Sequence, residues 1–385
     1  MSRPKLAHVT TVDLSLHGLL LHQMLSLRDA GYDVCGVSAP GRLVPALEAA
    51  GLRHHAATMS RNFSPLADLR SLWELWRIMR RERFDIVHTH TPKAGLLGQL
   101  AARLAGVPVI VNTVHGFYFH EHMPERSRRF YILMEKIAAL CSHAILSQNA
   151  EDLETAVREK ICRREKIRLL GNGIDLTQFD PSRFTADDEL RTRQELGIAA
   201  DAPVVGFVGR LAGKRKGFFD FLSAGKAIAA QRPDVRFLIA GAADAGKPDA
   251  VEPSVAADYG IAGRCVFVGH RENDTLPPLY HAMDVLVLPS LFEGVPRVVM
   301  EAAAMATPCV VSDVKGNREA VVNDRNGLLV PWSDVPALTA AILRILTEPA
   351  TAQRMSREAR IMATERFDER EVFGKVRDTY ARLLP

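Results

Sequence analysis

Residues 284–313 read DVLVLPSLFEGVPRVVMEAAAMATPCVVSD: an apolar run, a turn with glycine and proline, an apolar helical stretch and a second apolar run. Apolar strands that alternate with helices are typical of parallel sheets covered on both faces. The rest of the chain alternates in the same way, with further apolar runs at 84–90, 107–116, 203–211 and 235–243. The sequence therefore predicts an α/β protein built from doubly wound, Rossmann-like parallel sheets.

The strand and helix pattern is interrupted at 171–184 (GNGIDLTQFDPSRF) by glycine, proline and charged residues. A chain of 385 residues is also too long for one ordinary core. We therefore expect one domain over residues 1–172 and a second over 173–366. Two such domains facing each other would form a cleft at the carboxyl ends of their strands, where α/β sheets bind ligands. Residues 367–385 have a helical apolar stripe that could pack on either domain.

Composition excludes several classes of protein. The net charge of +4 arises in the first half, where residues 1–180 carry 23 Lys/Arg against 18 Asp/Glu, and no basic stripe interleaved with aromatics suggests a nucleic-acid partner. No apolar run approaches the roughly 20 residues of a membrane span. The N-terminus lacks the apolar core of a signal peptide. Five scattered cysteines without a CxxC pair fit a reducing compartment. A cytoplasmic protein is expected.

A basic loop, VGRLAGKRKGF (208–218), follows the first strand of the second domain and carries Arg210 and Lys216. Loops at strand ends, followed by a helix N-terminus, attract phosphate. Arginine adds a planar fork and lysine a point charge, a combination that suits a diphosphate. The alternative is a solvated basic loop.

Two glutamates lie eight residues apart after the run 284–290. Glu293 precedes the turn at Gly294, Val295 and Pro296, whose following helix would direct its backbone amides at the cleft. Glu301 lies within that apolar helix, and a buried carboxylate needs a hydrogen-bond partner such as a ribose hydroxyl. The alternative for Glu301 is a capped or ion-paired carboxylate at the domain surface.

His115, in TVHGFYFHEH (113–122), follows a strand of the first domain and is a third candidate, although loop histidines are often only solvated. Other patterns are weaker. GAADAGKP (241–248) resembles a P-loop but has Pro248 where Ser or Thr must bind magnesium. His88 and His90 have metal-ligand spacing, but no nearby Asp, Glu or Cys completes a site, so packing at the strand end is the better interpretation. No GxGxxG follows the first strand, which argues against a dinucleotide-binding oxidoreductase.

These residues together resemble the family-4 retaining glycosyltransferases, which have the two-domain GT-B fold. The resemblance runs over nearly the whole chain and rests on residues 84–117, on LLGNGIDLTQFDP (169–181), on VGRLAGKRKG (208–217) and on residues 284–313 with their E-x7-E pattern. One departure is the loop TTVDLSLHG (10–18), which has Leu14 and Ser15 where many members have a Gly-Gly pair.

The resemblance implies a role for each candidate residue. Glu293 matches the glutamate that holds donor-sugar hydroxyls, and Glu301 the one that holds the ribose. Arg210 and Lys216 match the pair that neutralises the donor diphosphate, and His115 matches a histidine that lies against the transferred sugar. The helix at 367–385 would pack back on the first domain.

The same resemblance implies a retaining transferase that uses a nucleotide-sugar donor, UDP-linked by family usage, and a glycan or lipid-linked acceptor. No metal and no other cofactor is expected. Two alternatives stay open: a sugar-nucleotide epimerase or hydrolase of the same fold, and a non-catalytic protein that binds sugar nucleotides.

A peripheral contact with the inner membrane face is a further hypothesis, because residues 69–84 (LRSLWELWRIMRRERF) combine tryptophans with Arg80, Arg81 and Arg83. The alternative is an ordinary amphipathic helix whose buried stripe comprises Leu69, Leu72, Trp73, Trp76 and Met79.

Overall fold

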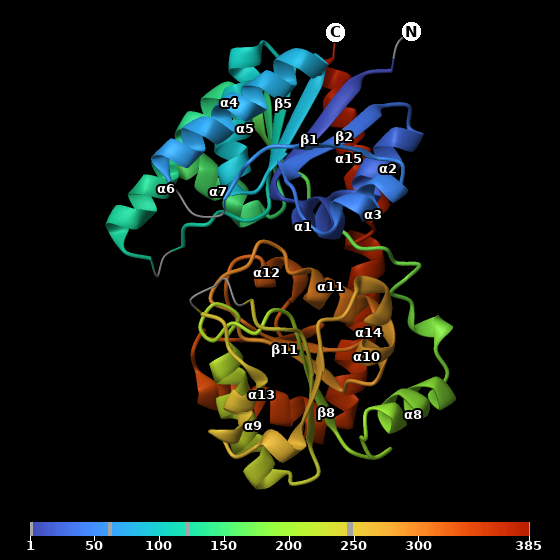
Figure 1. The fold of residues 1–385 in the computed structure, drawn as a ribbon. Helices are drawn as coiled ribbons and strands as arrows, with labels where there is room; N and C mark the ends of the chain where they lie inside the picture. Colours follow the sequence, from blue (N-terminus) through green and yellow to red (C-terminus); the bar gives the residue numbers. More distant parts are fainter. Residues whose placement is uncertain (1–2, 61–63, 121–122, 245–248, 385) are drawn as a thin grey trace. The chain divides into compact units, whose positions relative to one another are not determined.

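The computed structural model describes residues 3–60, 64–120, 123–244 and 249–384, and the chain divides into two compact units (Figure 1). Unit 1 comprises Met1–Gly171 with Arg370–Pro385, and unit 2 comprises Asn172–Glu369. The boundaries expected from the sequence are 172/173 and 366/367. Each unit is built around one parallel sheet with helices on both faces, which confirms the predicted fold class.

The sheet of unit 1 has the strand order β3-β2-β1-β4-β5-β6-β7, and all its pairs are parallel. Its strands are β1 (Lys5–Val12), β2 (Asp33–Ala39), β3 (Arg53–Ala56), β4 (Ile86–His90), β5 (Val109–Val114), β6 (Ala144–Ser147) and β7 (Ile167–Leu169). Strand β3 is the one that hydrophobic patterning misses. Its sequence, RHHA, has no apolar run because it lies at the edge of the sheet and is only partly buried.

Helices cover both faces of this sheet. They are α1 (Asp13–Ser15), a π-helical turn (Leu16–Leu20), α2 (Leu21–Asp29), α3 (Val44–Ala49), α4 (Pro65–Glu82), α5 (Pro92–Ala105), α6 (Glu125–Cys141), α7 (Ala150–Arg158) and α15 (Glu369–Leu383). Ala7, Val87 and Ile110 face α4 and α5 in one cluster. Their strand neighbours Leu6 and Ile86 face the opposite side, as the two-residue period of a strand requires.

Helix α15, the last helix of the chain, belongs to unit 1. Val372, Val376 and Tyr380 are buried in the same cluster as Leu6 and Ile86. Figure 1 shows this helix (red) beside the blue strands of the chain's beginning. Lys375 Nζ also donates to the carbonyl of Leu170, at 3.1 Å. The final helix therefore completes the core of the N-terminal unit.

The sheet of unit 2 has the order β10-β9-β8-β11-β12-β13, again with parallel pairing throughout. Its strands are β8 (Val204–Val208), β9 (Arg236–Ala240), β10 (Cys265–Gly269), β11 (Val285–Leu288), β12 (Cys309–Ser312) and β13 (Gly327–Val330). All six coincide with apolar runs in the sequence, including CVFVGH (265–270) for β10 and GLLVP (327–331) for β13.

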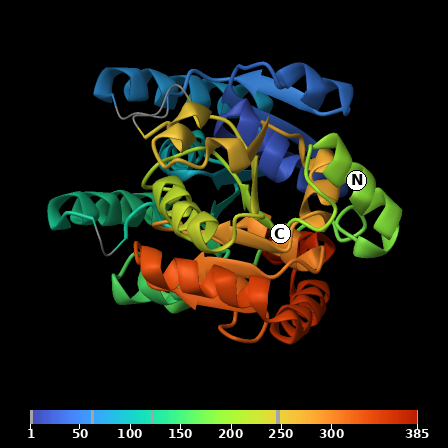
Figure 2. The same ribbon diagram turned by 90° about the horizontal axis from the view of Figure 1, so that it is seen from below.

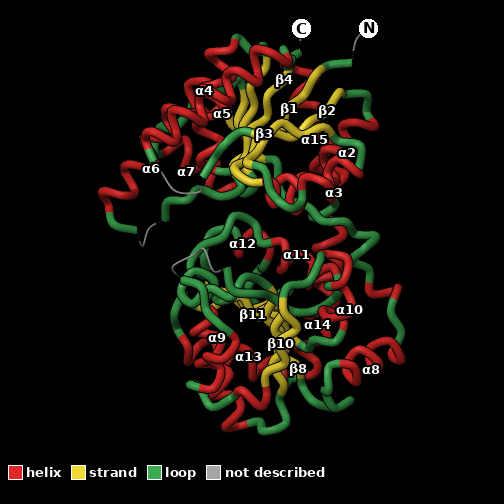
Figure 3. The backbone as a smooth tube through the Cα atoms, viewed as in Figure 1, coloured by secondary structure: helices red, strands yellow, loops and turns green. Residues whose placement is uncertain are grey.

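The helices of unit 2 form two layers. They are α8 (Ala186–Glu195), α9 (Phe218–Gln231), α10 (Pro277–His281), α11 (Arg297–Ala304), α12 (Asn317–Ala320), α13 (Val335–Thr347) and α14 (Pro349–Arg366). Helices α9 and α13 are neighbours on one face of the sheet, where they share a core cluster (Figure 2). Helices α10, α11 and α14 bury their apolar sides on the opposite face, as the yellow strands between red helices in Figure 3 show.

In both sheets the strand order reverses direction between the first and the fourth strand. The reversal falls between β1 and β4 in unit 1 and between β8 and β11 in unit 2. Loops that leave two such strands run to opposite faces and leave a crevice at the carboxyl ends, where doubly wound sheets bind ligands. Each unit therefore has one favoured position for a site.

The apolar stripe of the alternative interpretation is wrong for Leu69, Trp73 and Trp76, whereas Met79 is buried as expected. Ser71, Leu75, Ile78 and Met79 form the buried side of α4. Leu69 is 64% exposed, Trp73 52% and Trp76 36%, so these large side chains lie on the surface. Among the described residues, no helix is both long and apolar enough to cross a bilayer.

We expect Tyr380→Ala to destabilise unit 1 strongly, because the ring is fully buried in its core. Removing a buried aromatic side chain costs about 3–5 kcal/mol. Asp378→Ala on the exposed side of the same helix is the matched control and should change stability by about 0.5 kcal/mol or less. Urea unfolding measures both, and equal effects would mean that α15 does not contribute to the core.

Candidate functional site

Two loops in unit 2 lie next to each other at the point where the strand order reverses. One follows β8 (209–217) and the other follows β11 (289–296), and the two strands are directly paired. The backbone N–H of Leu291 donates to the carbonyl of Arg215 at 3.0 Å. The Arg215 guanidinium also lies 4.7 Å from the ring centre of Phe292. These contacts hold the two loops as one structural element.

Two glycines permit a close approach of backbone in this region. Gly217 has φ +67°, and a Cβ atom there would lie 2.0 Å from the carbonyl oxygen of Pro289. Gly316, with φ +76°, would place a Cβ 1.9 Å from the carbonyl oxygen of Gly294. Side chains at these positions would push the loop after β11 away from its neighbours.

Lys216 and Glu293 join the two loops through their side chains. Lys216 Nζ donates to Glu293 Oε1 at 2.6 Å, and the side chains are 21% and 10% exposed. The residue types that the sequence predicts for a diphosphate and for sugar hydroxyls thus meet in one ion pair. This pair is accessible enough for a ligand to compete for it.

Arg210 lies in the same loop as Lys216 and contacts two carboxylates. Its guanidinium nitrogens are 3.7 Å from Asp244 Oδ2 and 3.6 Å from Asp249 Oδ2, and its side chain is 20% exposed. These distances are longer than those of hydrogen bonds, so the donors of the guanidinium remain able to turn toward an anion. The two aspartates hold Arg210 near the strand end.

Helix α11 begins directly after this loop, with Pro296 at its N-cap. Among the described residues, no side chain caps this helix. Val295 is buried, and its carbonyl accepts a hydrogen bond from Asn172 Nδ2 at 3.0 Å. The positive end of the helix dipole therefore lies beside Gly294 and Glu293, where it favours an anion.

Glu301 lies in the middle of α11 and is only 3% exposed. Its Oε2 accepts a hydrogen bond from the Tyr280 hydroxyl at 2.8 Å, and its Oε1 is 3.7 Å from Arg297 Nε. Burial raises the pKa of Glu301, while Arg297 and Tyr280 oppose that shift. The carboxylate is ion-paired, as the alternative interpretation has it, but it is buried and not at the domain surface.

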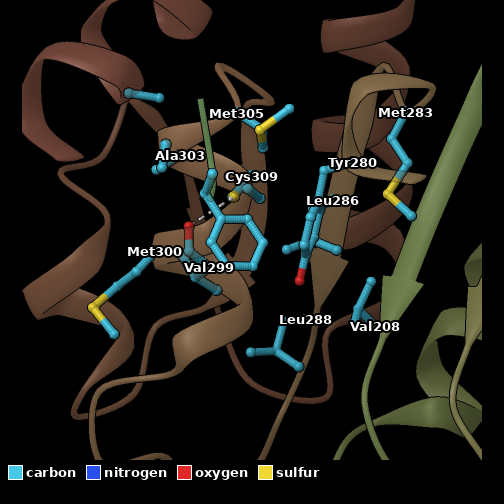
Figure 4. Packing of buried hydrophobic residues seen from close by; sticks show 14 of the residues in the cluster. Val208, Tyr280, Met283, Leu286, Leu288, Val299, Met300, Ala303, Met305 and Cys309 are labelled. Atoms are coloured by element: carbon cyan, nitrogen blue, oxygen red, sulfur yellow. Dashed lines mark hydrogen bonds between the residues drawn. The ribbon is translucent and has the colours of Figure 1, made fainter. Parts of the chain in front are cut away.

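Figure 4 shows how Tyr280 is held. The ring lies beside Leu286 of β11 in the cluster that also contains Val299 and Met300 of α11. Burial and the neighbouring Glu301 raise the pKa of Tyr280 well above its ordinary value, so the hydroxyl keeps its proton and acts as a donor. Tyr280 therefore fixes one oxygen of Glu301.

His115 lies just beyond the end of β5 in unit 1 and is partly exposed. Its Nε2 is 3.0 Å from Nδ1 of His90 on β4. Loss of solvent around the ring lowers the pKa of His115 to about 4, and a hydrogen bond with the Gln148 side chain acts in the opposite direction. The imidazole is therefore neutral near pH 7 and can form hydrogen bonds without adding charge.

Sequence reasoning misses several partners of these residues. Tyr280 and Asp249 lie outside every motif of the sequence, whereas Asp244 lies in the P-loop-like stretch and Arg297 between the two glutamates, where neither has a predicted role. Arg297 is four residues before Glu301, a spacing at which helical side chains meet, so it could have been found. The others are brought close only by the tertiary fold. Residues 245–248 of the P-loop-like stretch lie outside the described residues.

Glu301→Gln should raise the thermal stability of the ligand-free protein near pH 7.5. A carboxyl whose pKa is raised by folding is costly in its charged form, so wild type loses stability as pH rises through that raised pKa. Glutamine carries no charge and can still accept from Tyr280. The difference in melting temperature between the variant and wild type should therefore disappear as the pH falls toward about 4.3, the ordinary pKa of glutamate. A variant that melts below wild type at pH 7.5 would show that the Arg297 contact outweighs the cost of burial.

Comparison with known proteins identifies the family. The family model described as "Glycosyl transferase 4-like domain" matches residues 20–173, and "Glycosyl transferases group 1" matches residues 202–348. The chain is 32% identical over its full length, and over 98% of the relative, to an Escherichia coli UDP-Gal:alpha-D-GlcNAc-diphosphoundecaprenol alpha-1,3-galactosyltransferase. It is 26% identical, with the same coverage, to the capsular polysaccharide biosynthesis glycosyltransferase CapM of Staphylococcus aureus.

Solved structures show the same fold. Anabaena HepE in complex with UDP-glucose superposes with a TM-score of 0.83 at 22% identity, covering 98% of this chain and 99% of that one. A sucrose-phosphate synthase of Thermosynechococcus elongatus gives a TM-score of 0.82, also at 22% identity, over 99% of both chains. With two α/β units of the GT-B type, matches to both family models and a full-length relative at 32% identity, the chain belongs to the family-4-like, group 1 glycosyltransferases.

Proposed function

We propose that this glycosyltransferase moves a sugar from a UDP-sugar to a lipid-linked or glycan acceptor, with retention of anomeric configuration and without a metal ion. The observation that carries the proposal is the 2.6 Å contact between Lys216 and Glu293 at the strand reversal of unit 2. It places a cation for the diphosphate next to a carboxylate that can accept hydrogen bonds from sugar hydroxyls. Arg210 adds a second cation in the same loop.

In the proposed reaction the bond between the anomeric carbon and the β-phosphate oxygen breaks, and an acceptor oxygen bonds to that carbon on the same face. The departing phosphate takes the acceptor's proton. Negative charge grows on the diphosphate, where Lys216, Arg210 and the N-terminus of α11 stabilise it. These groups would supply the positive charge that a metal would otherwise provide.

The donor and acceptor classes follow from relatives and from the site. The Escherichia coli relative is named for UDP-galactose and for a diphosphoundecaprenol-linked acceptor, and HepE was crystallised with UDP-glucose. We propose Glu301 as the ribose-binding group, because a buried carboxylate at the end of a diphosphate site is suited to a pair of vicinal hydroxyls. His115 is proposed to contact the transferred sugar as a neutral imidazole.

One assay separates this function from its alternatives. Purified protein is incubated with UDP-galactose, UDP-glucose and UDP-N-acetylglucosamine, with and without a polyprenyl-diphosphate-linked sugar, and UDP release is measured. A transferase releases UDP only when the acceptor is present, and an α-linked product by NMR shows retention. An epimerase would interconvert the free donors and a hydrolase would release UDP alone. A binding protein would bind without turnover. Loss of turnover in EDTA would contradict metal independence.

Arg210→Ala and Lys216→Ala should each lower turnover about 100-fold or more, since each removes a contact to a charge that grows in the transition state. Lys216→Ala also leaves the Glu293 carboxylate, only 10% exposed, without its partner and should lower stability. The double variant Lys216→Ala/Glu293→Gln controls for this loss: it should regain melting temperature but not turnover. Near wild-type turnover in Arg210→Ala and Lys216→Ala would mean that this loop does not hold the leaving group.

The two glutamates should differ in ligand dependence. Glu301→Ala should weaken binding of UDP itself, and Glu293→Ala should spare UDP while removing the extra affinity that a UDP-sugar has over UDP. A hydrogen bond to a charged group contributes about 1.5–3 kcal/mol, so changes of about 10- to 100-fold are expected. Isothermal titration calorimetry with both ligands measures this. Equal losses for UDP and UDP-sugar in both variants would contradict the assignment.

We also propose that an apolar groove on unit 1 contacts an anionic membrane surface. The groove, about 710 Å³ in volume, lies on α4 and α5. Its lining comprises Leu66, Leu69, Arg70, Leu72, Trp73, Trp76 and Leu104. Leu66 is 85% exposed and Leu104 66%, and the Arg77 guanidinium lies 4.9 Å from the ring centre of Trp73. Exposed tryptophan and leucine beside arginines suit the interface of a bilayer with anionic lipids, where a polyprenyl-linked acceptor would reside.

Vesicle co-sedimentation tests this surface. Binding should require anionic lipid and fade with added salt. Arg80→Ser/Arg81→Ser/Arg83→Ser should weaken it by up to about 3 kcal/mol, and Leu69→Ser/Trp73→Ser should weaken it independently of salt. Arg191→Ser/Lys226→Ser/Arg357→Ser, which changes three exposed cations of unit 2, is the control for net charge. Equal loss in this control, or no binding by wild type at low salt, would contradict the proposal.

A further inference from the structure

Unit 1 carries a layer of buried histidines at its own strand reversal. His8 on β1 pairs in register with His88 on β4, and His90 follows two residues later on the same face. All three are at most 1% exposed. On this face of the sheet, the strands begin with apolar residues such as Leu6 and Ile86 and carry histidines toward their carboxyl ends.

Three of the rings form a chain of hydrogen bonds that ends at His115. His8 Nδ1 lies 2.9 Å from His90 Nε2, and His90 Nδ1 lies 3.0 Å from His115 Nε2. His88 stands beside this chain, since its Nδ1 bonds the Tyr380 hydroxyl at 2.6 Å and its Nε2 bonds Thr113 Oγ1 at 2.7 Å. His90 thus uses both nitrogens to connect a fully buried ring with the partly exposed one.

The direction of such a chain is restricted by the proton count. A neutral imidazole carries one N–H, so each ring in the chain donates with one nitrogen and accepts with the other. Burial lowers the pKa of His8 to about 3 and that of His90 well below its ordinary value, so the rings are neutral near pH 7. All the N–H groups must then point the same way along the chain.

The surroundings of His8 and His115, the two ends of the hydrogen-bond chain, determine which way its N–H groups point. His8 Nε2 is buried and has no hydrogen-bond partner. A buried N–H without a partner is rarer than an acceptor without one, so His8 carries its proton on Nδ1 and donates it to His90. At the other end, the Gln148 bond favours the protonated form of His115, as expected if the amide oxygen accepts an N–H from that ring. Because Nε2 of His115 is committed to His90, that N–H is on Nδ1.

We propose that His8 and His90 are positioning residues that hold His115 in a single orientation and in the Nδ1–H tautomer, so that His115 offers an N–H donor at the strand end. The tautomer and orientation follow from the hydrogen-bond chain itself. Only the catalytic consequence rests on the proposed function, in which the ligand of His115 is a hydroxyl of the transferred sugar. A sugar hydroxyl would take the place of the Gln148 oxygen and accept this N–H with a lone pair.

The same rings could be read as a metal site, because one ligand atom each from His8, His88 and His90 lies within 4.8 Å of the others. The distances favour hydrogen bonds. Two imidazole nitrogens on one tetrahedral zinc at about 2.0–2.1 Å would lie about 3.3 Å apart, whereas His8 Nδ1 and His90 Nε2 are 2.9 Å apart. Both nitrogens of His88 already have hydrogen-bond partners.

The tautomer can be measured without any activity assay. Two-bond ¹H–¹⁵N spectra of ligand-free, ¹⁵N-histidine-labelled protein at pH 7.5 distinguish a protonated ring nitrogen from a bare one. In wild type, His8, His90 and His115 should all show protonated Nδ1 and bare Nε2. A His115 ring protonated on Nε2 would overturn the proposal. One equivalent of zinc bound to the purified protein and lost in His8→Phe would also overturn it.

Substitution then tests the positioning role. His90→Phe keeps a buried ring but removes the donor to His115, so His115 should shift toward the Nε2–H form and turnover should fall about 10-fold. Tyr380→Phe is the matched control, since it removes a buried hydroxyl from the same layer outside the chain. Tyr380→Phe should leave the His115 tautomer unchanged and should keep turnover within twofold of the wild-type value. An unchanged His115 tautomer in folded His90→Phe would overturn the proposal. If the protein lacks transferase activity, the proposed function fails, but the spectra still show whether His90 sets the tautomer of His115.

Discussion

The parallel pairing of β8 with β11 is the interaction on which the candidate site of unit 2 depends. These strands are far apart in the sequence, and their pairing makes neighbours of two loops that would otherwise be separate. Hydrogen bonds between strands therefore determine that Lys216 and Glu293 meet, before either side chain contributes its own energy. Backbone contacts at Gly217 and Gly316 then fix the loops closely enough for an ion pair of 2.6 Å.

The charged groups near this pairing are nearly balanced in the absence of a donor. Lys216 has Glu293, Arg210 has two aspartates, and Glu301 has Arg297. Each cation is thus held in place by a carboxylate, yet each pair keeps some exposure or a long contact distance. A diphosphate entering such a site would exchange partners with carboxylates and would not meet bare cations. The fold thus positions the cations, but it does not provide a large excess of positive charge.

Much of this arrangement could be predicted from the sequence, because it is expressed locally. Apolar runs identify every strand of unit 2, and the E-x7-E pattern leads to Glu293 and Glu301. The short edge strand β3 has no such signal, and apolar residue type alone predicts burial for Leu69, Trp73 and Trp76, which lie on the surface of α4. Tyr280, Asp244 and the link from His8 through His90 to His115 depend on strands and helices that meet only in three dimensions. No spacing in the chain encodes those contacts.

The position of α15 has a consequence for synthesis on the ribosome. Unit 2 is one continuous stretch, Asn172–Glu369, whereas the core of unit 1 also needs Val372, Val376 and Tyr380, which are made after unit 2. Domains usually fold in the order in which they are made. Here unit 1 lacks α15 while unit 2 is being made, although Leu16, Leu20 and Met24 already pack in the cluster that contains Leu6, Ile86 and Val111. The core of unit 1 is therefore incomplete while unit 2 is being made.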